Sequence, residues 1–346
     1  MPRVLTLREL NRTTLLRQLL LKRARLRVVP ALERLSGLQA QWAPSPYVAL
    51  WSRLEGFRRE QLEKALARDA VLKGTLMRAT LHLVSARDYR FLAAAVREAV
   101  VGMRARGVER PSDEAVRRAV ELARAGPVTR RELLALLGHD APLSAAVDAR
   151  PFRELHWLLA LAQLEQAPEA AFWSPPRVTP FRRVDLALPD PAEGRVHLVR
   201  RYLGAYGPAS RTDLAAWSRV PLRDLDPALE SLRLRTFEDE AGRALLDLPR
   251  APLAEGTEPA PVRFLPRWEE ALLAYDRRAR ILPDDLRSSV IAVGGDVAQT
   301  ILVDGFVAGL WRVERERVVV EQFDPLPLRA RRELEDEARR LQTFLR

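Results

Sequence analysis

Two versions of one short sequence occur in this chain, and they read Gly126-Pro127-Val128-Thr129-Arg130-Arg131-Glu132-Leu133 and Gly207-Pro208-Ala209-Ser210-Arg211-Thr212-Asp213-Leu214. In both, a Gly-Pro turn leads to a hydroxyl residue, and a carboxylate follows three positions later. This spacing indicates a helix start, because the hydroxyl caps the first turn while the carboxylate accepts a hydrogen bond from the backbone N–H of the cap. A looser copy begins at Thr6, with Glu9 as its carboxylate. Since many helices begin this way, the flanking sequence decides what the repeat means.

The sequence around both copies has the same order of elements. A helical pattern of apolar residues precedes each copy, over residues 113–124 and 194–206, and another follows it. The second copy then continues through a helical pattern to two apolar runs, 233–237 and 244–248, which a polar turn separates. Helix, capped helix, helix and hairpin is the order of a winged-helix unit. We therefore predict an α+β, mainly helical fold with three tandem winged-helix units, over residues 1–90, 91–180 and 193–250.

The sequence changes character after the proline-rich linker 249–261. Apolar runs at 300–303 and 306–311 meet at Asp304-Gly305, and an Asp-Gly pair between such runs is a strong signal for a type I′ hairpin. A further β-like run follows at 318–320, and residues 329–345 have the pattern of an amphipathic helix. We predict a C-terminal β-rich cap over residues 260–346 that this helix closes.

The charge of the chain favours an anionic partner. Its 57 lysine and arginine residues exceed its 46 acidic residues, which gives a formal net charge of +11. All of these basic residues except Lys22, Lys64 and Lys73 are arginine, a bias that a GC-rich genome produces as readily as a phosphate-binding role does. Charge alone therefore does not decide between nucleic acid and other polyanions.

Several classes of site are excluded or disfavoured by composition. The absence of cysteine excludes disulfides, thiolate metal sites and a cysteine nucleophile. The four histidines are too scattered to indicate a metal cluster, so we expect no metal and no cofactor. Residues 1–12 lack the apolar run of a signal peptide, and the long uncharged stretch 35–52 is too polar to span a bilayer. We expect a cytoplasmic, nucleoid-associated protein with no membrane contact.

The triplet Gln39-Ala40-Gln41 is the most informative motif for function. A break at Ser36-Gly37 precedes it and two prolines follow it, so it lies in a short bounded connection. Residues two apart in an extended segment face the same way, so we expect the amides of Gln39 and Gln41 to converge on one point. Neutral amides are weak acids and bases, but they hold a water and a polar substrate edge in place. The substrate must then already be activated. A polar turn whose amides satisfy backbone groups is the alternative interpretation.

Several stretches around this triplet resemble one known family. They are Gly37-Leu38-Gln39-Ala40-Gln41, Pro46-Tyr47, Leu50-Trp51-Ser52-Arg53-Leu54, Leu76-Met77-Arg78-Ala79-Thr80-Leu81-His82-Leu83-Val84, Arg201-Tyr202-Leu203-Gly204-Ala205-Tyr206-Gly207-Pro208 and Leu302-Val303-Asp304-Gly305-Phe306-Val307-Ala308-Gly309-Leu310-Trp311. Together they extend over nearly the whole chain, which resembles the AlkZ/YcaQ class of DNA glycosylases. Members share tandem winged-helix motifs around a DNA-binding concavity, in agreement with the repeat. The resemblance therefore implies a concave DNA-binding surface.

The resemblance implies excision of alkylated bases from double-stranded DNA, including N7-alkylguanine and, in some members, interstrand cross-links. Guanine alkylated at N7 is cationic, so its glycosidic bond is weak and the neutral base leaves with little acid catalysis. The family's triplet is Gln-hydrophobic-Gln in the AlkZ branch and Gln-hydrophobic-Asp in the YcaQ branch, and this chain has the first form. Carried over, Gln39 and Gln41 are the catalytic residues, which orient the water beneath C1′ and stabilise the oxocarbenium-like sugar. We expect a monomeric, monofunctional glycosylase restricted to labile cationic lesions.

Three candidates for DNA contact lie in one stretch. Residues 76–84 have the alternation of a strand, with Arg78, Thr80 and His82 on one face. We expect this face to line the cleft of the glutamines, where Arg78 contacts a phosphate, Thr80 donates a hydrogen bond, and His82 either positions the lesion or binds the sugar-phosphate backbone. The alternative is that Thr80 and His82 form a satisfied polar pair at a domain edge.

Three further arginines are candidates for contact with DNA outside this stretch. Arg130 and Arg211 lie at the two capped helix starts, where a recognition helix contacts phosphates. Arg312 follows the Asp304-Gly305 hairpin, which we expect either to lie against a DNA groove or simply to complete a sheet.

Two other functions stay open on the sequence alone. A non-catalytic winged-helix DNA-binding protein, such as a regulator, would use the same basic surfaces without chemistry at the glutamines. A hydrolase of a small substrate is disfavoured, because no Ser/His/Asp constellation and no paired-carboxylate motif stands out. Both DNA-binding hypotheses predict an affinity that falls as salt rises.

Overall fold

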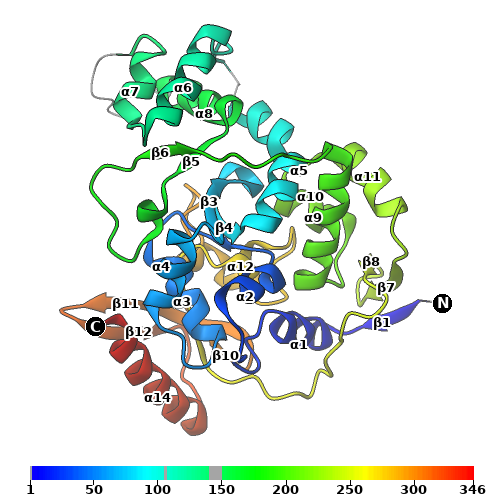
Figure 1. Cartoon of the computed structure of the whole chain (residues 1–346). Coiled ribbons are helices and arrows are strands. Elements are labelled where there is room, and N and C mark those ends of the chain that lie inside the picture. The colour runs from blue at the N-terminus through cyan, green and yellow to red at the C-terminus, as the bar shows by residue number, and fades with distance from the viewer. Residues whose placement is uncertain (1, 105–106, 140–149) are drawn as a thin grey trace.

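The computed structural model describes residues 2–104, 107–139 and 150–346. Figure 1 shows a mainly helical molecule in which helices surround several small sheets, with the two termini on opposite sides. Three helices begin with the capping boxes that the sequence predicted, at Thr6, Thr129 and Ser210. In each box the hydroxyl accepts from the N–H three residues later, and the carboxylate there accepts from the N–H of the cap. The predicted helix starts are confirmed at all three copies.

The N-terminal part contains a three-stranded antiparallel sheet with the order β2-β4-β3. This order places β2, which ends at Gln39, at one edge of the sheet beside β4. The elements of this part are β1 (Arg3–Leu5), α1 (Leu7–Arg17), α2 (Val28–Leu35), β2 (Leu38–Gln39), α3 (Pro44–Arg53), α4 (Arg59–Ala67), β3 (Val71–Thr75), η1 (Met77–Ala79) and β4 (Leu81–Ser85).

The prediction of one strand over residues 76–84 is wrong. The chain turns through the 3-10 segment η1, and β4 begins only at Leu81. Arg78 and Ala79 have φ angles of 56° and 54°, a left-handed conformation that L-residues rarely adopt. Two such residues in succession interrupt the alternation of a strand, so the polar residues of this stretch do not share one strand face.

The middle part forms a lobe at one end of the molecule, which α5 joins to the rest (Figure 1). This lobe has its own hydrophobic core, in which Leu133 and Leu158 are fully buried. Its small sheet pairs β5 with β6. The elements are α5 (Ala86–Arg104), α6 (Asp113–Ala125), α7 (Arg130–Ala135), α8 (Arg150–Ala162), β5 (Leu164–Gln166), η2 (Pro168–Ala171) and β6 (Phe181–Arg183).

The third part follows the predicted order of helix, capped helix, helix and hairpin. It consists of α9 (Pro191–Tyr206), α10 (Arg211–Ser218), α11 (Leu222–Glu230), β7 (Arg235–Asp239) and β8 (Ala244–Asp247). The N-terminal β1 adds to this hairpin in parallel with β7, which gives a sheet with the order β1-β7-β8. The first and third parts are thus joined by backbone pairing, and the division of the chain into three winged-helix units at the predicted boundaries stays a prediction.

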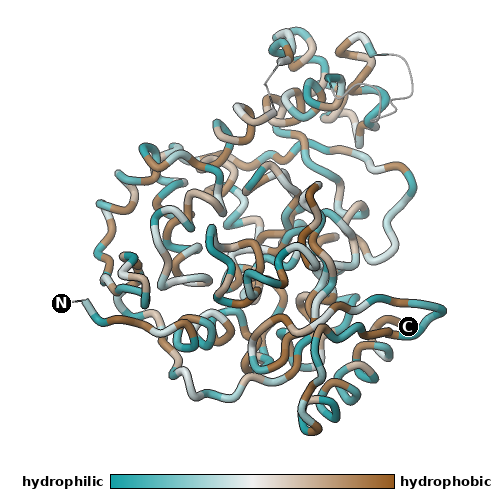
Figure 2. Tube along the Cα trace, turned by 180° about the vertical axis from the view of Figure 1, so that it is seen from behind, coloured by the Kyte–Doolittle hydropathy of each residue, from teal (hydrophilic) through white to brown (hydrophobic). Residues whose placement is uncertain are grey.

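The C-terminal part contains the predicted β-rich segment, an antiparallel sheet with the order β12-β11-β10-β9. Its elements are β9 (Arg263–Leu265), α12 (Glu270–Leu273), η3 (Asp284–Leu286), α13 (Arg287–Val290), β10 (Thr300–Val303), β11 (Phe306–Glu314), β12 (Arg317–Gln322) and the closing helix α14 (Leu328–Leu345). The turn at Asp304-Gly305 has φ angles of 47° and 82°, as a type I′ hairpin requires. In the view from behind, hydrophilic positions recur along α14, as expected for an amphipathic helix at the surface (Figure 2).

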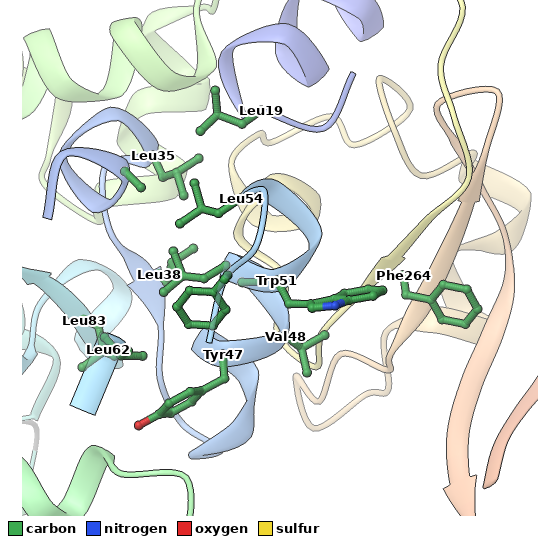
Figure 3. Packing of buried hydrophobic residues seen from close by; sticks show 14 of the residues in the cluster. Leu19, Leu35, Leu38, Tyr47, Val48, Trp51, Leu54, Leu62, Leu83 and Phe264 are labelled. Carbon is green, nitrogen blue, oxygen red and sulfur yellow. The ribbon is translucent and has the colours of Figure 1, made fainter. Parts of the chain in front are cut away.

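One hydrophobic core joins the N-terminal part to the C-terminal sheet. In Figure 3, Trp51 of α3 points toward Phe264 of β9, while Leu38 and Leu83 of the β2-β4 pair lie on the other side of α3. All four side chains are buried. The strands that carry the glutamine triplet are therefore fixed against a packed interior, and packing of this density holds side-chain positions closely.

Candidate active site

The glutamine triplet lies where β2 leaves the sheet. Gln39 pairs with His82 of β4, and the N–H of Ala40 donates to the carbonyl of Leu81 at 2.7 Å. Ala40 is buried in the core, whereas Gln39 is 5% exposed and Gln41 is exposed to solvent. The hydrophobic residue between the glutamines thus fastens the triplet to the interior. One amide is enclosed and the other faces an open surface.

Both amides hydrogen-bond to the same short connection between η1 and β4. Gln39 Oε1 accepts from Arg78 Nη2 at 3.0 Å, and Gln41 Oε1 accepts from the N–H of Leu81 at 2.8 Å. A guanidinium and a backbone N–H can only donate, so each partner fixes which end of the amide is the oxygen. Each glutamine therefore keeps an amide NH₂ and one oxygen lone pair for a further ligand.

Arg78 reaches Gln39 from a backbone conformation that is unusual for arginine. Its Nη2 also donates to Glu270 Oε1 at 2.6 Å, and its Nη1 donates to the carbonyl of Trp217 at 3.1 Å. The left-handed φ at Arg78 costs about 1–2 kcal/mol in an L-residue, and such strain persists only where surrounding contacts hold it. The contacts with Glu270, Trp217 and Gln39 are of this kind.

Glu270 is the centre of this buried network, which we call the Arg78–Glu270 brace and define as Gln39, Arg78, His82, Trp217 and Glu270. Its Oε1 accepts from Arg78 and lies 2.9 Å from His82 Nε2, and its Oε2 accepts from the Trp217 indole at 3.0 Å. Burial raises the pKa of Glu270, but the charge of Arg78 and hydrogen bonds from His82 and Trp217 outweigh it and lower the pKa to about 2. The carboxylate is therefore ionised over the whole physiological range.

Glu269, the residue before Glu270, holds the start of α12 against α3. Its carboxylate accepts from Arg53 Nη2 at 2.7 Å, and both side chains are fully buried. Glu269 also caps α12 by accepting from the N–H of Ala271. Two adjacent carboxylates thus connect α12 to α3 and to the glutamine triplet.

Thr80 and His82 have partners within the protein. Thr80 Oγ1 donates to the carbonyl of Met77 at 3.1 Å, and His82 Nδ1 lies 3.0 Å from the carbonyl of Thr80. His82 is fully buried, with its other nitrogen on Glu270. His82 lies on the central strand β4, between β2 and β3, and its ring is buried against Glu270, so a contact of His82 with DNA stays a prediction.

Arg130 and Gln41, which are far apart in the sequence, line one cavity. It has a volume of about 120 Å³ and lies between the β2-β4-β3 sheet and the middle lobe. Arg130 is the first residue of α7, so its position agrees with a phosphate contact at a helix start. The lining consists of Gln41, Thr75, Ala79, Leu81, Arg130, Phe152, Leu155, His156, Leu159, Glu165, Gln166 and Phe181.

The other two predicted arginines lie at the surface and form ion pairs. Arg211, at the start of α10, pairs with Asp226, and Arg312 of β11 pairs with Glu314 and Glu321. The side chain of each is about half exposed, at 52% and 50%. Exposed pairs of this kind are weak, so DNA phosphates can replace the carboxylates. Their contacts with DNA stay predictions.

The Asp304-Gly305 turn does not project from the molecule. Asn11 Nδ2 donates to the carbonyl of Gly305 at 2.8 Å, and Arg12 Nη1 donates to the carbonyl of Asp304 at 2.9 Å. A side chain at position 305 would clash with Asn11, Arg12 and Leu15 of α1. The turn therefore packs on α1 and completes the sheet, which was the second of the two interpretations.

Sequence analysis missed Glu270, Trp217 and Glu165. Glu270 is 192 positions from Arg78, and no local pattern distinguishes it from the other acidic residues of the chain. The one available signal was the adjacent pair Glu269-Glu270 between apolar residues, because two neighbouring buried carboxylates require cationic partners.

Within residues 2–104, 107–139 and 150–346, no group of three His, Asp or Glu side chains is placed to hold a metal ion. None of the helices in these ranges combines the length and hydrophobicity that a bilayer crossing requires.

Comparisons with known proteins agree on one family. Residues 32–344 match the model of the family described as DNA glycosylase AlkZ-like. An interstrand DNA cross-link repair glycosylase of Streptomyces sahachiroi is 27% identical over an alignment of 154 residues, and the match covers 41% of this chain and 41% of that protein. The solved structure of Streptomyces sahachiroi DNA glycosylase AlkZ superposes with a TM-score of 0.79 at 23% identity, over 97% of this chain and 95% of the other, and shares the fold. The chain belongs to the AlkZ-like family of DNA glycosylases.

Proposed function

We propose that this protein hydrolyses the N-glycosidic bond of N7-alkylated purines in double-stranded DNA. The observation that carries this proposal is the pair of glutamine amides, each held through its oxygen by a donor from the 78–81 segment. Family membership supplies the reaction class, an N-glycosyl hydrolysis on DNA. The geometry fixes two neutral amides, which suit a substrate that is already activated.

The chemistry requires little of the protein beyond positioning. In a guanine alkylated at N7, the positive base withdraws electrons from the C1′–N9 bond, which breaks with the electron pair leaving on the base. Water attacks C1′, loses a proton to solvent and leaves an abasic site, while the released base is neutral. The free oxygen lone pair of Gln39 accepts a hydrogen bond from this water, and the amide dipoles of both glutamines favour the developing positive charge on the sugar.

The two glutamines divide this work unequally. Gln39 is enclosed and its amide orientation is fixed by the Arg78–Glu270 brace, so we assign it the orientation of the water. Gln41 is exposed beside the 120 Å³ cavity, so we assign it contact with the sugar or the base. Such preorganisation lowers the barrier because the dipoles need no rearrangement during the reaction.

Contact with the DNA backbone is assigned to exposed arginines on separate elements. Arg130 of α7 and Arg211 of α10 begin capped helices, and Arg312 lies on β11. Phosphate contacts from several such elements are expected when tandem winged-helix units bind a duplex. The similarity to a cross-link repair glycosylase makes interstrand cross-links the second substrate to test.

The test is release of 7-methylguanine from a methylated duplex by the purified protein. The double variant Gln39→Ala/Gln41→Ala is compared with the native protein, and its DNA affinity is measured by mobility shift. We expect release by the native protein, loss in the variant and equal binding to undamaged duplex. If the native protein binds DNA but releases no base from a methylated or cross-linked duplex, the proposal is wrong and the non-catalytic DNA-binding alternative stands.

A further inference from the structure

A carboxyl group lies in the cavity beside Gln41 and is not used by the reaction described above. Glu165 of β5 lines this cavity from the middle lobe, opposite the N-terminal sheet. Its Oε1 accepts from the Tyr89 hydroxyl of α5 at 2.7 Å, and its Oε2 accepts from the N–H of Thr75 at the end of β3 at 3.2 Å. Three elements therefore hold this carboxyl in a fixed orientation.

The backbone at Gly74 makes room for this arrangement. A Cβ at this position would lie 2.7 Å from the Tyr89 ring and 3.1 Å from the Glu165 carboxyl. Both distances are too short for a carbon contact, and the φ of Gly74 is not positive. Glycine is therefore required here by the close approach of the carboxyl and not by backbone conformation.

The charges around Glu165 leave its negative charge uncompensated within the protein. Arg130 lines the same cavity, and Arg97 lines a smaller hollow beside the carboxyl. In the described part of the chain, Glu165 forms no salt bridge with either arginine. Burial raises the pKa of Glu165 to about 7, against the opposing effect of the hydrogen bonds from Tyr89 and Thr75. A bound cation would restore full ionisation.

The cavity is large enough for part of a nucleobase. Its volume of about 120 Å³ is of the same order as the ~150 Å³ apolar cavity that binds benzene in another protein. Apolar side chains, including Phe152, Leu155 and Phe181, form one part of its wall, and Gln41 and Glu165 form a polar part. Flat apolar walls with a few polar groups are typical of sites that bind a ring.

We propose that this cavity receives the alkylated base and that Glu165 recognises its positive charge. The inference rests on the proposed function and names the residue that separates cationic lesions from neutral bases. An N7-alkylguanine carries its charge on the ring that would enter the cavity, and a carboxylate within about 4–6 Å of a cation favours the charged pair. A neutral guanine forms no charge pair with Glu165, and burial then favours the protonated carboxyl.

The test measures lesion preference without catalysis. One duplex carries 2′-fluoro-7-methyldeoxyguanosine, whose electron-withdrawing fluorine slows glycosidic cleavage, and a second duplex carries guanine at that position. We expect native protein to bind the first at least tenfold more tightly, and Glu165→Gln to lose this preference while its affinity for the plain duplex stays unchanged. The glutamine preserves the fold, because its oxygen accepts from Thr75 while its NH₂ donates to the Tyr89 oxygen.

A second variant separates charge recognition from a structural role. Tyr89→Phe removes a hydrogen bond that favours the ionised carboxyl, so the pKa of Glu165 rises further. We expect its lesion preference at pH 7 to fall below that of native protein, while Glu165→Gln shows no preference. A Glu165→Gln protein that keeps the native preference would overturn the inference, as would native protein that shows no preference.

Failure of the inference and failure of the proposed function are distinguishable. If native protein prefers the lesion duplex but releases no base from a hydrolysable one, the hydrolysis is wrong and the binding site stands. If native protein releases 7-methylguanine and Glu165→Gln does so at the same rate with the same preference, the hydrolysis stands and the role of Glu165 is wrong.

Discussion

The two glutamines of the triplet lie in opposite surroundings, although only one residue separates them. Gln39 is enclosed and held by the Arg78–Glu270 brace, in which a carboxylate has its pKa lowered to about 2 by a cation and two hydrogen bonds. Gln41 faces an open cavity in which a second carboxyl, Glu165, has its pKa raised to about 7 by burial without an ion pair. We call Gln39 and the brace the closed side of the site, because the partners of its charged groups all lie within the protein. On the Gln41 side, which we call the open side, no cation pairs with Glu165 within the residues that the structure describes.

This difference indicates how such a site separates positioning from recognition. A group that must orient a water benefits from partners that are satisfied before the substrate arrives, because no reorganisation is then needed. A group that must detect a charge benefits from being unsatisfied, because binding then supplies what is missing. The closed side should therefore control stability and rate, and the open side should control the choice of substrate.

The largest expected effect is a loss of stability when the ion pair between Glu270 and Arg78 is removed. Glu270→Ala leaves Arg78 buried without its carboxylate, and breaking a buried ion pair costs about 3–5 kcal/mol. Thermal unfolding followed by circular dichroism should show a large fall in Tm. As the matched control on the open side, Glu165→Ala removes a carboxyl without an ion pair and should cost clearly less. Equal falls in Tm for Glu270→Ala and Glu165→Ala would contradict the difference between the closed and open sides.

The next largest effect is on rate. Gln39→Ala should lower the single-turnover rate of 7-methylguanine release by about 10²–10³-fold, by analogy with removal of a preorganised dipole at a transition state. Gln41→Ala should lower it less and should also weaken binding of lesion-containing duplex, because its exposed amide faces the cavity. Single-turnover rates and dissociation constants for both variants check this. The assignment of different roles to the two glutamines is wrong if both variants lower the rate by the same factor and neither changes the dissociation constant.

The closed side could not be found from the sequence because its residues lie far apart along the chain. Sequence patterns predicted the capped starts of α1, α7 and α10 and the Asp304-Gly305 hairpin, since each depends on neighbouring residues. They also located the triplet. The partners of Arg78 come from α12 and from the end of α10, however, and only tertiary packing brings them together.

The error at residues 76–84 has the same origin. Alternation of polar and apolar residues is typical of a strand, and it occurs here in a stretch that begins with a turn. Arg78 adopts its left-handed conformation because Glu270, Trp217 and Gln39 hold its guanidinium, and none of these contacts is visible in a local pattern. A strained functional position is where pattern-based reasoning is expected to fail.

A smaller effect concerns electrostatic contact with DNA at the open side. Arg130→Gln should weaken binding to any duplex and should reduce the slope of log K against log salt by about 0.9 if it loses one phosphate contact. Arg329→Gln is the matched control, since this exposed arginine lies on α14, at the other end of the molecule from α7 (Figure 1). Filter-binding titrations over a range of salt measure both slopes. An unchanged slope for Arg130→Gln would show that the residue does not contact a phosphate.

The smallest effect is the dependence of stability on pH, and the two carboxyls should contribute with opposite signs. Glu270 is ionised in the folded protein down to about pH 2, so its contribution is present above pH 4.5 and is lost as the pH falls from there. Glu165 keeps a proton up to about pH 7 that the unfolded chain has already released, so its contribution falls as the pH rises from 4.5 to 7.

Glu165→Gln removes this second dependence. Its Tm relative to native protein should therefore increase between pH 4.5 and 7, by an amount that corresponds to a stability change on the order of 1 kcal/mol. Melting curves at steps of half a pH unit measure this difference in Tm. A difference that does not change with pH would show that Glu165 is ionised throughout the range and needs no bound cation to become ionised.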